Sequence, residues 1–342
     1  MSDLESELDA IASAESFSGV VRVERPGRPL LEKAYGLADK GHGIPNRIET
    51  QFGIASGTKS LTALTIVSLI EEGRLELSTT ARSLLGDDLP LIADDVTIEH
   101  LLSHRSGIGD YLDEEVELDY DAYLMPVPAQ ELATTEQYLP ILDGHATKFP
   151  AGERFGYCNG GFVVLALIAE RVSGVPFPEL VHQRVCEPAG MVDTAFLRSD
   201  ELPGSAATGY LEAAGVWRTN VFHLPVRGTG DGGIYTTVTD VSSLWNALFS
   251  GRIVSPDWVA ELVRSRSDVA AESGAGARRY GLGFWLHAST DAVTMSGGDT
   301  GVSFRSVHDP RSGVTHTVIS NTSDGAGLIT RYLDERLETG TA

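Results

Sequence analysis

The chain has 342 residues, 42% of them hydrophobic and 22% charged, and a formal net charge of −22. This length suits one large domain or two that share a core. The acidic excess argues against nucleic acid and anionic membranes as partners, because both would repel it. With two cysteines, no basic leader and no apolar run of 18 residues, we expect a cytoplasmic protein without a disulfide framework or a membrane span; the alternative is an exported protein whose leader has been removed.

The first third of the chain predicts one helix, two strands and a second helix. The pattern favours an amphipathic helix over 3–14 and two strands in SGVVRVER and PLLEKAYGLA. The second helix follows in FGIASGTKSLTALTIVSLIEEG, with Gly73 as its stop. Its apolar residues, Leu61, Leu64, Val67, Leu69 and Ile70, leave few polar faces, so we expect this helix to be buried on nearly every side.

The middle of the chain predicts helical pieces, and strands return after residue 205. We expect a short helix in TIEHLLSHRSGI ending at Gly107 and a longer apolar one in GGFVVLALIAERVSG capped by Gly174. A helix in TVTDVSSLWNALFSG has Thr239 near its N-cap. Strands follow at 281–287, 292–296, 302–308 and 314–320, before a last helix in AGLITRYLDERLE.

Strands at both ends of the chain and helices in its middle predict an α/β fold of the α+β type. We expect an antiparallel sheet flanked by helices and built from both termini, residues 1–75 and 206–342. A mostly helical region over 76–205 would be inserted into it. No repeat of 20 to 50 residues is evident.

Ser56 and Lys59 form a Ser-x-x-Lys motif at the start of the second helix. Residues i and i+3 of a helix project from one face, so the two side chains should lie together. A serine hydroxyl needs a base to become a nucleophile, and a lysine pushed into apolar surroundings can be a neutral amine. Amides at the helix start can stabilise an oxyanion. The alternative is an N-capping serine beside a lysine that reaches to solvent.

Tyr157 and Asn159 form a Tyr-x-Asn motif just before the apolar helix of the middle region. A tyrosine whose phenolate is favoured by a nearby lysine can pass a proton between nucleophile and leaving group. The asparagine can anchor the lysine and donate to the substrate carbonyl. In a chain of this composition, roughly 0.05 accidental joint occurrences of the two motifs are expected. The alternative is a turn in which the tyrosine merely packs.

These segments resemble the serine β-lactamase and penicillin-binding-protein superfamily, in the branch of class C β-lactamases, D-Ala-D-Ala carboxypeptidases, D-aminopeptidases and β-lactamase-like esterases. FGIASGTKSLTAL and FGYCNGGFVVLALIAERVSG match its two motif blocks, and TIEHLLSHRSGI, GMVDTAF and GGIYTTVTDVSSL resemble connecting blocks. The resemblance implies a β-lactamase/transpeptidase-like fold with the active site between sheet and helical region. It implies Ser56 as the acylated nucleophile, Lys59 as its partner, Tyr157 as general base and acid, and Asn159 as a substrate-positioning residue.

The third motif of this superfamily, Lys-Thr-Gly or His-x-Gly on a strand, lacks its cation here. The matching segment is VTMSGGDTGVSFRS, with Ser296, Gly297 and Gly298 in the best alignment and a shift of one residue left open. Ser296 offers only a neutral hydrogen bond, and Asp299 would repel a carboxylate by a few kcal/mol at about 4 Å. By resemblance, the backbone amides of Ser56 and Asp299 form the oxyanion hole.

Other motifs are weaker. Residue 54 is isoleucine where the Gly-x-Ser-x-Gly motif of α/β-hydrolases would need glycine, so the sequence does not support that fold around Ser56. No spacing of the histidines predicts a metal site, and we expect neither a metal nor a cofactor. The segment GTGDGG at 228–233 lacks the rest of a phosphate loop and favours a mobile wall of the site. We expect His104 to be a structural, hydrogen-bonded histidine and Cys158 a small buried residue.

The sequence therefore predicts a serine hydrolase that cleaves carboxylic esters or small amides through an acyl-enzyme on Ser56. One alternative is a D-amino-acid-specific peptidase or carboxypeptidase, or a weak β-lactamase. Another is a non-catalytic ligand-binding module that keeps the serine pocket. The expected partner is a small ester, amide or peptide; the pattern gives no oligomeric state.

Overall fold

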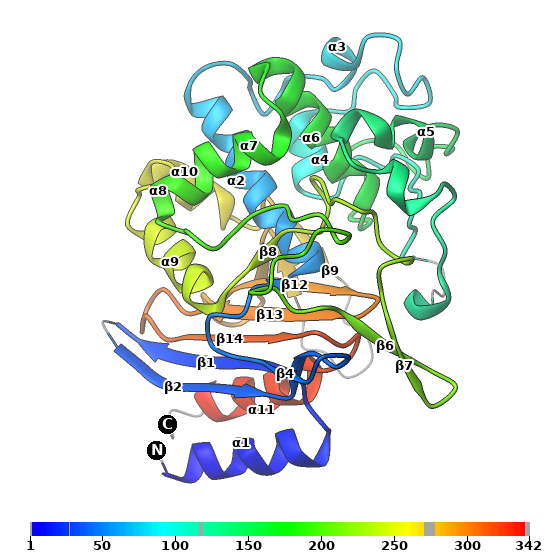
Figure 1. The fold of residues 1–342 in the computed structure, drawn as a ribbon. Helices are drawn as coiled ribbons and strands as arrows, with labels where there is room; N and C mark the ends of the chain where they lie inside the picture. Colours follow the sequence, from blue (N-terminus) through cyan, green and yellow to red (C-terminus); the bar gives the residue numbers. More distant parts are fainter. Residues whose placement is uncertain (1, 27, 116–118, 270–277, 339–342) are drawn as a thin grey trace.

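One eight-stranded antiparallel sheet forms the middle layer of the molecule in a computed structural model that describes residues 2–26, 28–115, 119–269 and 278–338 (Figure 1). The strands lie in the order β2-β1-β14-β13-β12-β11-β10-β9. Their bounds are β1 Gly19–Arg25, β2 Arg28–Tyr35, β9 Ser267–Val269, β10 Arg278–Tyr280, β11 Trp285–His287, β12 Val293–Asp299, β13 Val302–His308 and β14 Thr315–Ser320. The sheet thus comes from both ends of the chain, as the sequence predicted.

The first and last long strands of the chain are neighbours in this sheet. β1 pairs with β14 from Gly19↔Ser320 to Glu24↔Thr315. Val20 points to one face and Val21 to the other, and both are fully buried. The sheet therefore carries a core on each face.

Two terminal helices cover one face of the sheet, α1 (Ser2–Ala14) and α11 (Ala326–Glu338). Leu8 and Leu333 are fully buried there in one cluster with Val21 and Val318. The expected amphipathic helix is confirmed, since Leu4, Leu8 and Ala12 are buried on one side of it and Ile11 packs there partly buried.

The opposite face packs against α2 (Thr58–Glu71), α9 (Val238–Phe249) and the helical region, which Figure 1 shows on the far side of the sheet from α1. Every residue of α2 from Thr58 to Leu69 is buried, as expected. The other helices are α3 Arg82–Leu85, α4 Ile98–Leu102, α5 Leu139–Leu142, α6 Asn159–Ser173, α7 Phe177–Val181, α8 Glu187–Ala189 and α10 Pro256–Leu262.

Short elements complete the described part of the chain. They are the 3₁₀ turns η1 Ala55–Gly57, η2 Tyr120–Ala122, η3 Ala129–Glu131 and η4 Thr135–Tyr138, the π-helical turn η5 His182–Cys186, and the strand pairs β3 Leu37–Asp39 with β4 Ile44–Pro45, β5 Phe52–Gly53 with β8 Tyr235–Thr236, and β6 Tyr210–Ala213 with β7 Val216–Thr219. No single helix among the described residues is long and apolar enough to cross a membrane; the pair α6 and α7–α8 meets that test only jointly, across an 84° bend.

The structure corrects four predicted boundaries. Thr237, not Thr239, caps α9, because its side chain accepts the Asp240 N–H. α4 ends at Leu102, well before Gly107. The strand expected at 281–287 is confined to Trp285–His287, and the one expected at 292–296 continues to Asp299. The fold class is confirmed, whereas the domain boundaries near residues 75 and 205 stay a prediction.

Candidate active site

Ser56 lies in the η1 turn that leads directly into α2. The preceding residue, Ala55, has a φ of 43°, a conformation that costs energy in a residue with a side chain. The Lys59 Nζ lies 2.8 Å from Ser56 Oγ, so the i, i+3 spacing places amine and hydroxyl together as predicted. The strained turn thus places the Ser56 hydroxyl next to the Lys59 amine at the start of a buried helix.

Lys59 is 2% exposed and has two further partners. Its Nζ lies 2.7 Å from Asn159 Oδ1 and 2.8 Å from the backbone oxygen of Asp231. Burial lowers the pKa of Lys59, although nearby carboxylates oppose the shift. A neutral amine has two N–H donors for the two carbonyl oxygens and one lone pair left for the Ser56 hydroxyl. The arrangement therefore suits an amine that accepts the serine proton.

Tyr157 lies in the segment before α6, and its ring centroid is 5.0 Å from Lys59 Nζ. Burial raises the pKa of Tyr157 well above 10, and a hydrogen bond with Ser56 only partly opposes this. Our expectation that Lys59 favours the phenolate is therefore wrong for the resting protein. Desolvation is the largest cause of this shift, so Tyr157 is a neutral phenol and Lys59 is the better first base.

Asn159 begins α6 and holds Lys59 with its side-chain oxygen. Its Nδ2 donates to the Leu112 oxygen at 3.0 Å and to Glu114 Oε1 at 2.9 Å. Both amide protons are therefore used. The expected anchoring of Lys59 is present, whereas the expected donation to substrate is not, because the donors face Leu112 and Glu114.

The glycine that the third motif needs is Gly297. A Cβ there would lie 2.1 Å from the Ile54 oxygen and 2.8 Å from the Ser56 nitrogen, whereas a Cβ on Gly298 would meet nothing within 4 Å. Only a glycine lets β12 approach the nucleophile turn this closely. The three-residue motif is therefore shifted by one from the best alignment, with Met295 in the first place and Ser296 in the second. Met295 is buried and apolar, so the cation is still missing.

The strand register also shows that the second oxyanion donor was assigned to the wrong residue. Asp299 pairs with Val302 across a two-residue turn, and the pair that closes such a hairpin exchanges its own N–H···O bonds. The Asp299 amide is therefore directed to β13 and is unsuitable as predicted. Pairing alternates along β12, so the Gly298 amide points away from β13, toward the side on which Ser56 lies. Ser56 and Gly298 are the candidate pair of donors.

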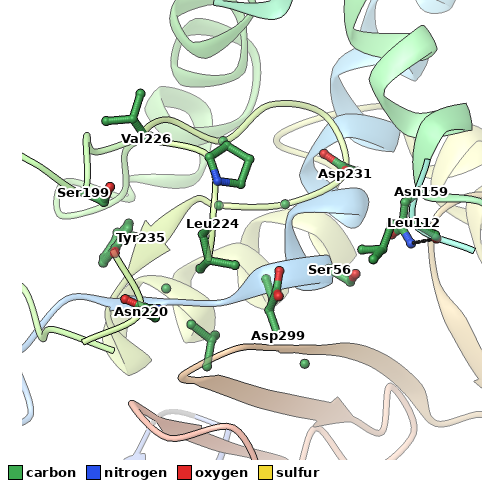
Figure 2. Close-up of a pocket in the computed structure, with 18 of the residues that line it drawn as sticks. Ser56, Leu112, Asn159, Ser199, Asn220, Leu224, Val226, Asp231, Tyr235 and Asp299 are labelled. Carbon is green, nitrogen blue, oxygen red and sulfur yellow. Dashed lines mark hydrogen bonds between the residues drawn. The ribbon is translucent and has the colours of Figure 1, made fainter. Parts of the chain in front are cut away.

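Two hollows meet at Ser56. The inner hollow, seen in Figure 2, is lined by Ser56 together with Glu114, Asn159, Asp231, Gly298 and Asp299. The outer hollow is lined by Ser56 together with Tyr157, Arg278, Trp285, Ser296 and Gly298. Ser296 therefore lies beside the nucleophile, as predicted, but on the outer side only.

Sequence reasoning missed three carboxylates around the nucleophile, Asp110, Glu114 and Asp231. Asp110 accepts the backbone amides of Asn159 and Gly160, and burial raises its pKa to about 6. Burial also raises the pKa of Asp231, and it raises that of Asp299 to about 7 with repulsion from Asp231 and Glu114. Asp231 stands in the GTGDGG segment, which does form a wall of the inner hollow. An acidic residue between glycines was the only sequence signal for it.

His104 and Cys158 have the structural roles predicted for them. The His104 Nδ1 accepts the Cys158 N–H at 3.1 Å, and its ring lies 4.3 Å from the Tyr157 ring. Burial lowers the pKa of His104 well below 6.5, so it is a neutral acceptor. The Cys158 sulfur accepts the Gly161 N–H, and burial raises the pKa of its thiol. Among the described residues, no group of three or more His, Cys, Asp or Glu could hold a metal.

The model of the family described as Beta-lactamase matches residues 4–338 of this chain. The chain belongs to the beta-lactamase family. Family membership confirms the predicted resemblance and supports the predicted serine hydrolase. The match covers both ends of the eight-stranded sheet and the whole helical region.

Relatives of this chain within the beta-lactamase family are named for different activities. A penicillin-binding protein from Bacillus halodurans has a solved structure with a TM-score of 0.88 and 35% identity, covering 96% of this chain and 99% of that one. Esterase EstB of Burkholderia gladioli is 28% identical over 84% of this chain and 79% of its own length. A D-aminopeptidase of Brucella anthropi is 27% identical over 79% of this chain, which spans about half, 49%, of that protein. These relatives differ in the reactions they are named for.

Proposed function

We propose that the protein hydrolyses carboxylic esters or small neutral amides through an acyl-enzyme on Ser56. The observation that carries this is the 2.8 Å contact between a buried amine and a serine hydroxyl, with Tyr157 beside both: it lines the outer hollow with Ser56, and its ring centroid lies 5.0 Å from Lys59 Nζ. A non-catalytic binding module has no need for this arrangement, because burying a lysine without a salt-bridge partner is costly.

In the first half-reaction, Ser56 Oγ attacks the substrate carbonyl as its proton passes to neutral Lys59. The amides of Ser56 and Gly298 bind the oxyanion. The bond to the leaving group then breaks, and the leaving group takes the proton of the Tyr157 hydroxyl. Lys59, now an ammonium, returns a proton to Tyr157. A positioned acid of this kind contributes on the order of 10²–10⁴ in rate.

In the second half-reaction, a water molecule attacks the acyl carbonyl and gives its proton to Lys59 through Tyr157. The acyl–Oγ bond breaks, and Ser56 recovers its proton. The neutral third motif supports uncharged substrates over β-lactams and D-Ala-D-Ala peptides, because Met295 and Ser296 offer a substrate carboxylate no charge.

The test is hydrolysis of p-nitrophenyl butyrate by the wild type and by Ser56→Ala, with intact-mass measurement after a fluorophosphonate. We expect one adduct on the wild type, none on the variant, and loss of turnover in the variant. Equal rates in both proteins would remove Ser56 from the reaction. A matched control is Ser78→Ala, an exposed serine outside both hollows, which should keep full activity.

A further inference from the structure

Glu114 borders the place where the two hollows meet. Among the described residues, those that line both hollows are Ser56, Gly298 and Glu114. Ser56 is the nucleophile, and the Gly298 amide is a candidate oxyanion donor. Glu114 is a carboxylate that has no part in the two half-reactions given above. Its position at the reacting carbonyl calls for a chemical explanation.

A chain of hydrogen bonds connects Glu114 to the nucleophile. Ser56 Oγ lies 2.8 Å from Lys59 Nζ, which lies 2.7 Å from Asn159 Oδ1. Nδ2 of the same amide donates to Glu114 Oε1 at 2.9 Å. No other hydrogen bond reaches the Glu114 carboxylate from the described residues, and this side chain is exposed. One carboxylate oxygen is therefore fixed by the site, and the other is accessible to water.

The bond to Asn159 does not need the negative charge of Glu114. A neutral glutamine would accept the same N–H. The charge also has a cost, since repulsion from Glu114 adds to the effect of burial in raising the pKa of Asp299. The adjacent Glu115 is held by a lysine and an arginine, whereas Glu114 belongs to no ion pair in the described part of the chain. A charge kept at an electrostatic cost beside a nucleophile indicates a function for it.

The water of the second half-reaction must come to the place that the leaving group has left. Tyr157 lines the outer hollow and not the inner one, so the leaving group that it protonates lies in the outer hollow. By the reverse step, Tyr157 takes a proton from a water molecule at the same position. Glu114 lines this hollow too. Water has two O–H bonds, and only one of its protons goes to Tyr157, so the other O–H is free to donate to a carboxylate.

We propose that Glu114 accepts a hydrogen bond from the hydrolytic water in the outer hollow and orients it for attack on the acyl carbon. The inference rests on the proposed hydrolysis at Ser56 and assigns a further residue to its second half-reaction. The water oxygen bonds to the acyl carbon while one proton passes to Lys59 through Tyr157. The acyl–Oγ bond then breaks, and Ser56 recovers a proton from Lys59. The second water proton stays on the acid product, so Glu114 ends the step unchanged.

The test uses an acceptor that has only one O–H. Methanol can attack the acyl-enzyme in place of water and form a methyl ester, but it has no second O–H for Glu114. With p-nitrophenyl butyrate in dilute methanol, Glu114→Gln should raise the ratio of methyl butyrate to butyrate on the order of tenfold, because only the attack of water loses a charge-assisted hydrogen bond. Gas chromatography measures both products. The glutamine keeps an acceptor for Asn159 Nδ2.

Glu114→Gln should also accumulate acyl-enzyme. In plain buffer, kcat should fall on the order of tenfold, because breakdown of the acyl-enzyme limits turnover of an activated ester. The ratio kcat/KM, which reports acylation, should stay near the wild-type value. Intact-mass measurement after an acid quench should show a butyryl adduct. Glu114→Ala removes the partner of Asn159 as well, so it should lower kcat/KM too.

Glu49→Gln is the matched control, since it removes the same charge from an exposed position outside both hollows. It should keep the wild-type product ratio and kcat. A wild-type product ratio in Glu114→Gln would overturn the inference. So would an equal fall of kcat and kcat/KM, because Glu114 would then only support Asn159.

Two further outcomes separate this inference from the proposed function. If the wild type forms no methyl ester, the lifetime of the acyl-enzyme in Glu114→Gln decides, and a wild-type lifetime overturns the inference. If Ser56→Ala hydrolyses the ester as fast as the wild type, the proposed function fails, and the inference fails with it. Hydrolysis that depends on Ser56 but shows neither change in Glu114→Gln refutes the inference alone.

Discussion

Three residues divide the proton chemistry because their surroundings differ. Lys59 is buried among carbonyl oxygens, which keep an amine in place without requiring it to be charged. Tyr157 is buried against aromatic rings, including that of Trp285 at 6.1 Å, so its neutral form is favoured. Ser56 lies between them. The direction of proton flow, from serine to lysine and from tyrosine to leaving group, follows from these two pKa shifts.

Lys59→Met should lower kcat for p-nitrophenyl butyrate by about 10²–10⁴, because the serine loses its base. In the wild type, kcat should rise with pH as Lys59 loses its proton, and its lowered pKa places this rise below the range of a free lysine. The pH profile measures this. Lys33→Met, at a surface lysine paired with Glu5, should keep both rate and profile. A Lys59→Met enzyme with the wild-type profile would contradict the assignment.

Gly297→Ala should abolish activity and lower stability, because its Cβ would lie 2.1 Å from the Ile54 oxygen and displace the nucleophile turn. Gly298→Ala should fold normally and retain most activity, because space is open and the backbone N–H is kept. Steady-state kinetics and thermal melts of the two variants provide the check. The reverse order of damage would show that the motif register is wrong.

At the scale of elements, the site depends on where helices begin. α6 starts at Asn159 because Asp110 accepts two of its first amides and Cys158 accepts a third. His104 holds the Cys158 amide between the two motif residues. Helix starts are thus fixed by side chains from other segments, which explains why the caps were the weakest part of the sequence prediction.

The cap of α9 is a direct test of one corrected boundary. Thr237→Ala should lower the free energy of unfolding by about 1 kcal/mol, because the Asp240 N–H loses its acceptor. Thr239→Ala, at an exposed position two residues on, should leave the stability within about 0.5 kcal/mol of wild type. Urea unfolding of both variants measures this. Equal losses would mean that the capping interaction contributes little.

At the scale of the whole molecule, one sheet contains strands from both chain ends, and the helical region packs against it. β1 and β14 are adjacent, so the ends fold as one unit, and the cores on the two faces share its strands. The net charge of −22 produces electrostatic repulsion within the folded molecule. Buried carboxyls add to that repulsion once they ionise.

The contribution of two buried carboxyls to stability should fall as pH rises from 5 to 8, whereas the buried neutral His104 and His308 act in the opposite direction up to about pH 6.5. The folded-state pKa values of Asp110, about 6, and Asp299, about 7, lie above their ordinary value of 3.8. Their stabilising effect is complete below about pH 4 and is lost as pH rises through 6 and 7. Exposed carboxyls with lowered pKa, such as Glu115, are already ionised throughout this window.

Unfolding free energies at pH 5 and 8 measure the effect. Asp299→Asn should raise the stability at pH 8 relative to that at pH 5 by on the order of 1–2 kcal/mol, because the carboxyl that ionises in this range is removed. Asp95→Asn should leave the difference unchanged, because that side chain is exposed. A difference that Asp299→Asn does not alter would place the pH dependence elsewhere.

The sequence by itself determined the fold class, the order of the main helices and strands, and the partnership of Ser56 with Lys59. These follow from local periodicity and from spacing within one helix turn, which do not depend on distant residues. Only the tertiary structure decided that Gly298 and not Asp299 faces the nucleophile, that Asn159 holds Lys59 with its donors already used, and that Asp231 lines the inner hollow with Asp299. Strand register, hydrogen-bond partners and desolvation all arise between segments far apart in the chain, and no local pattern encodes them.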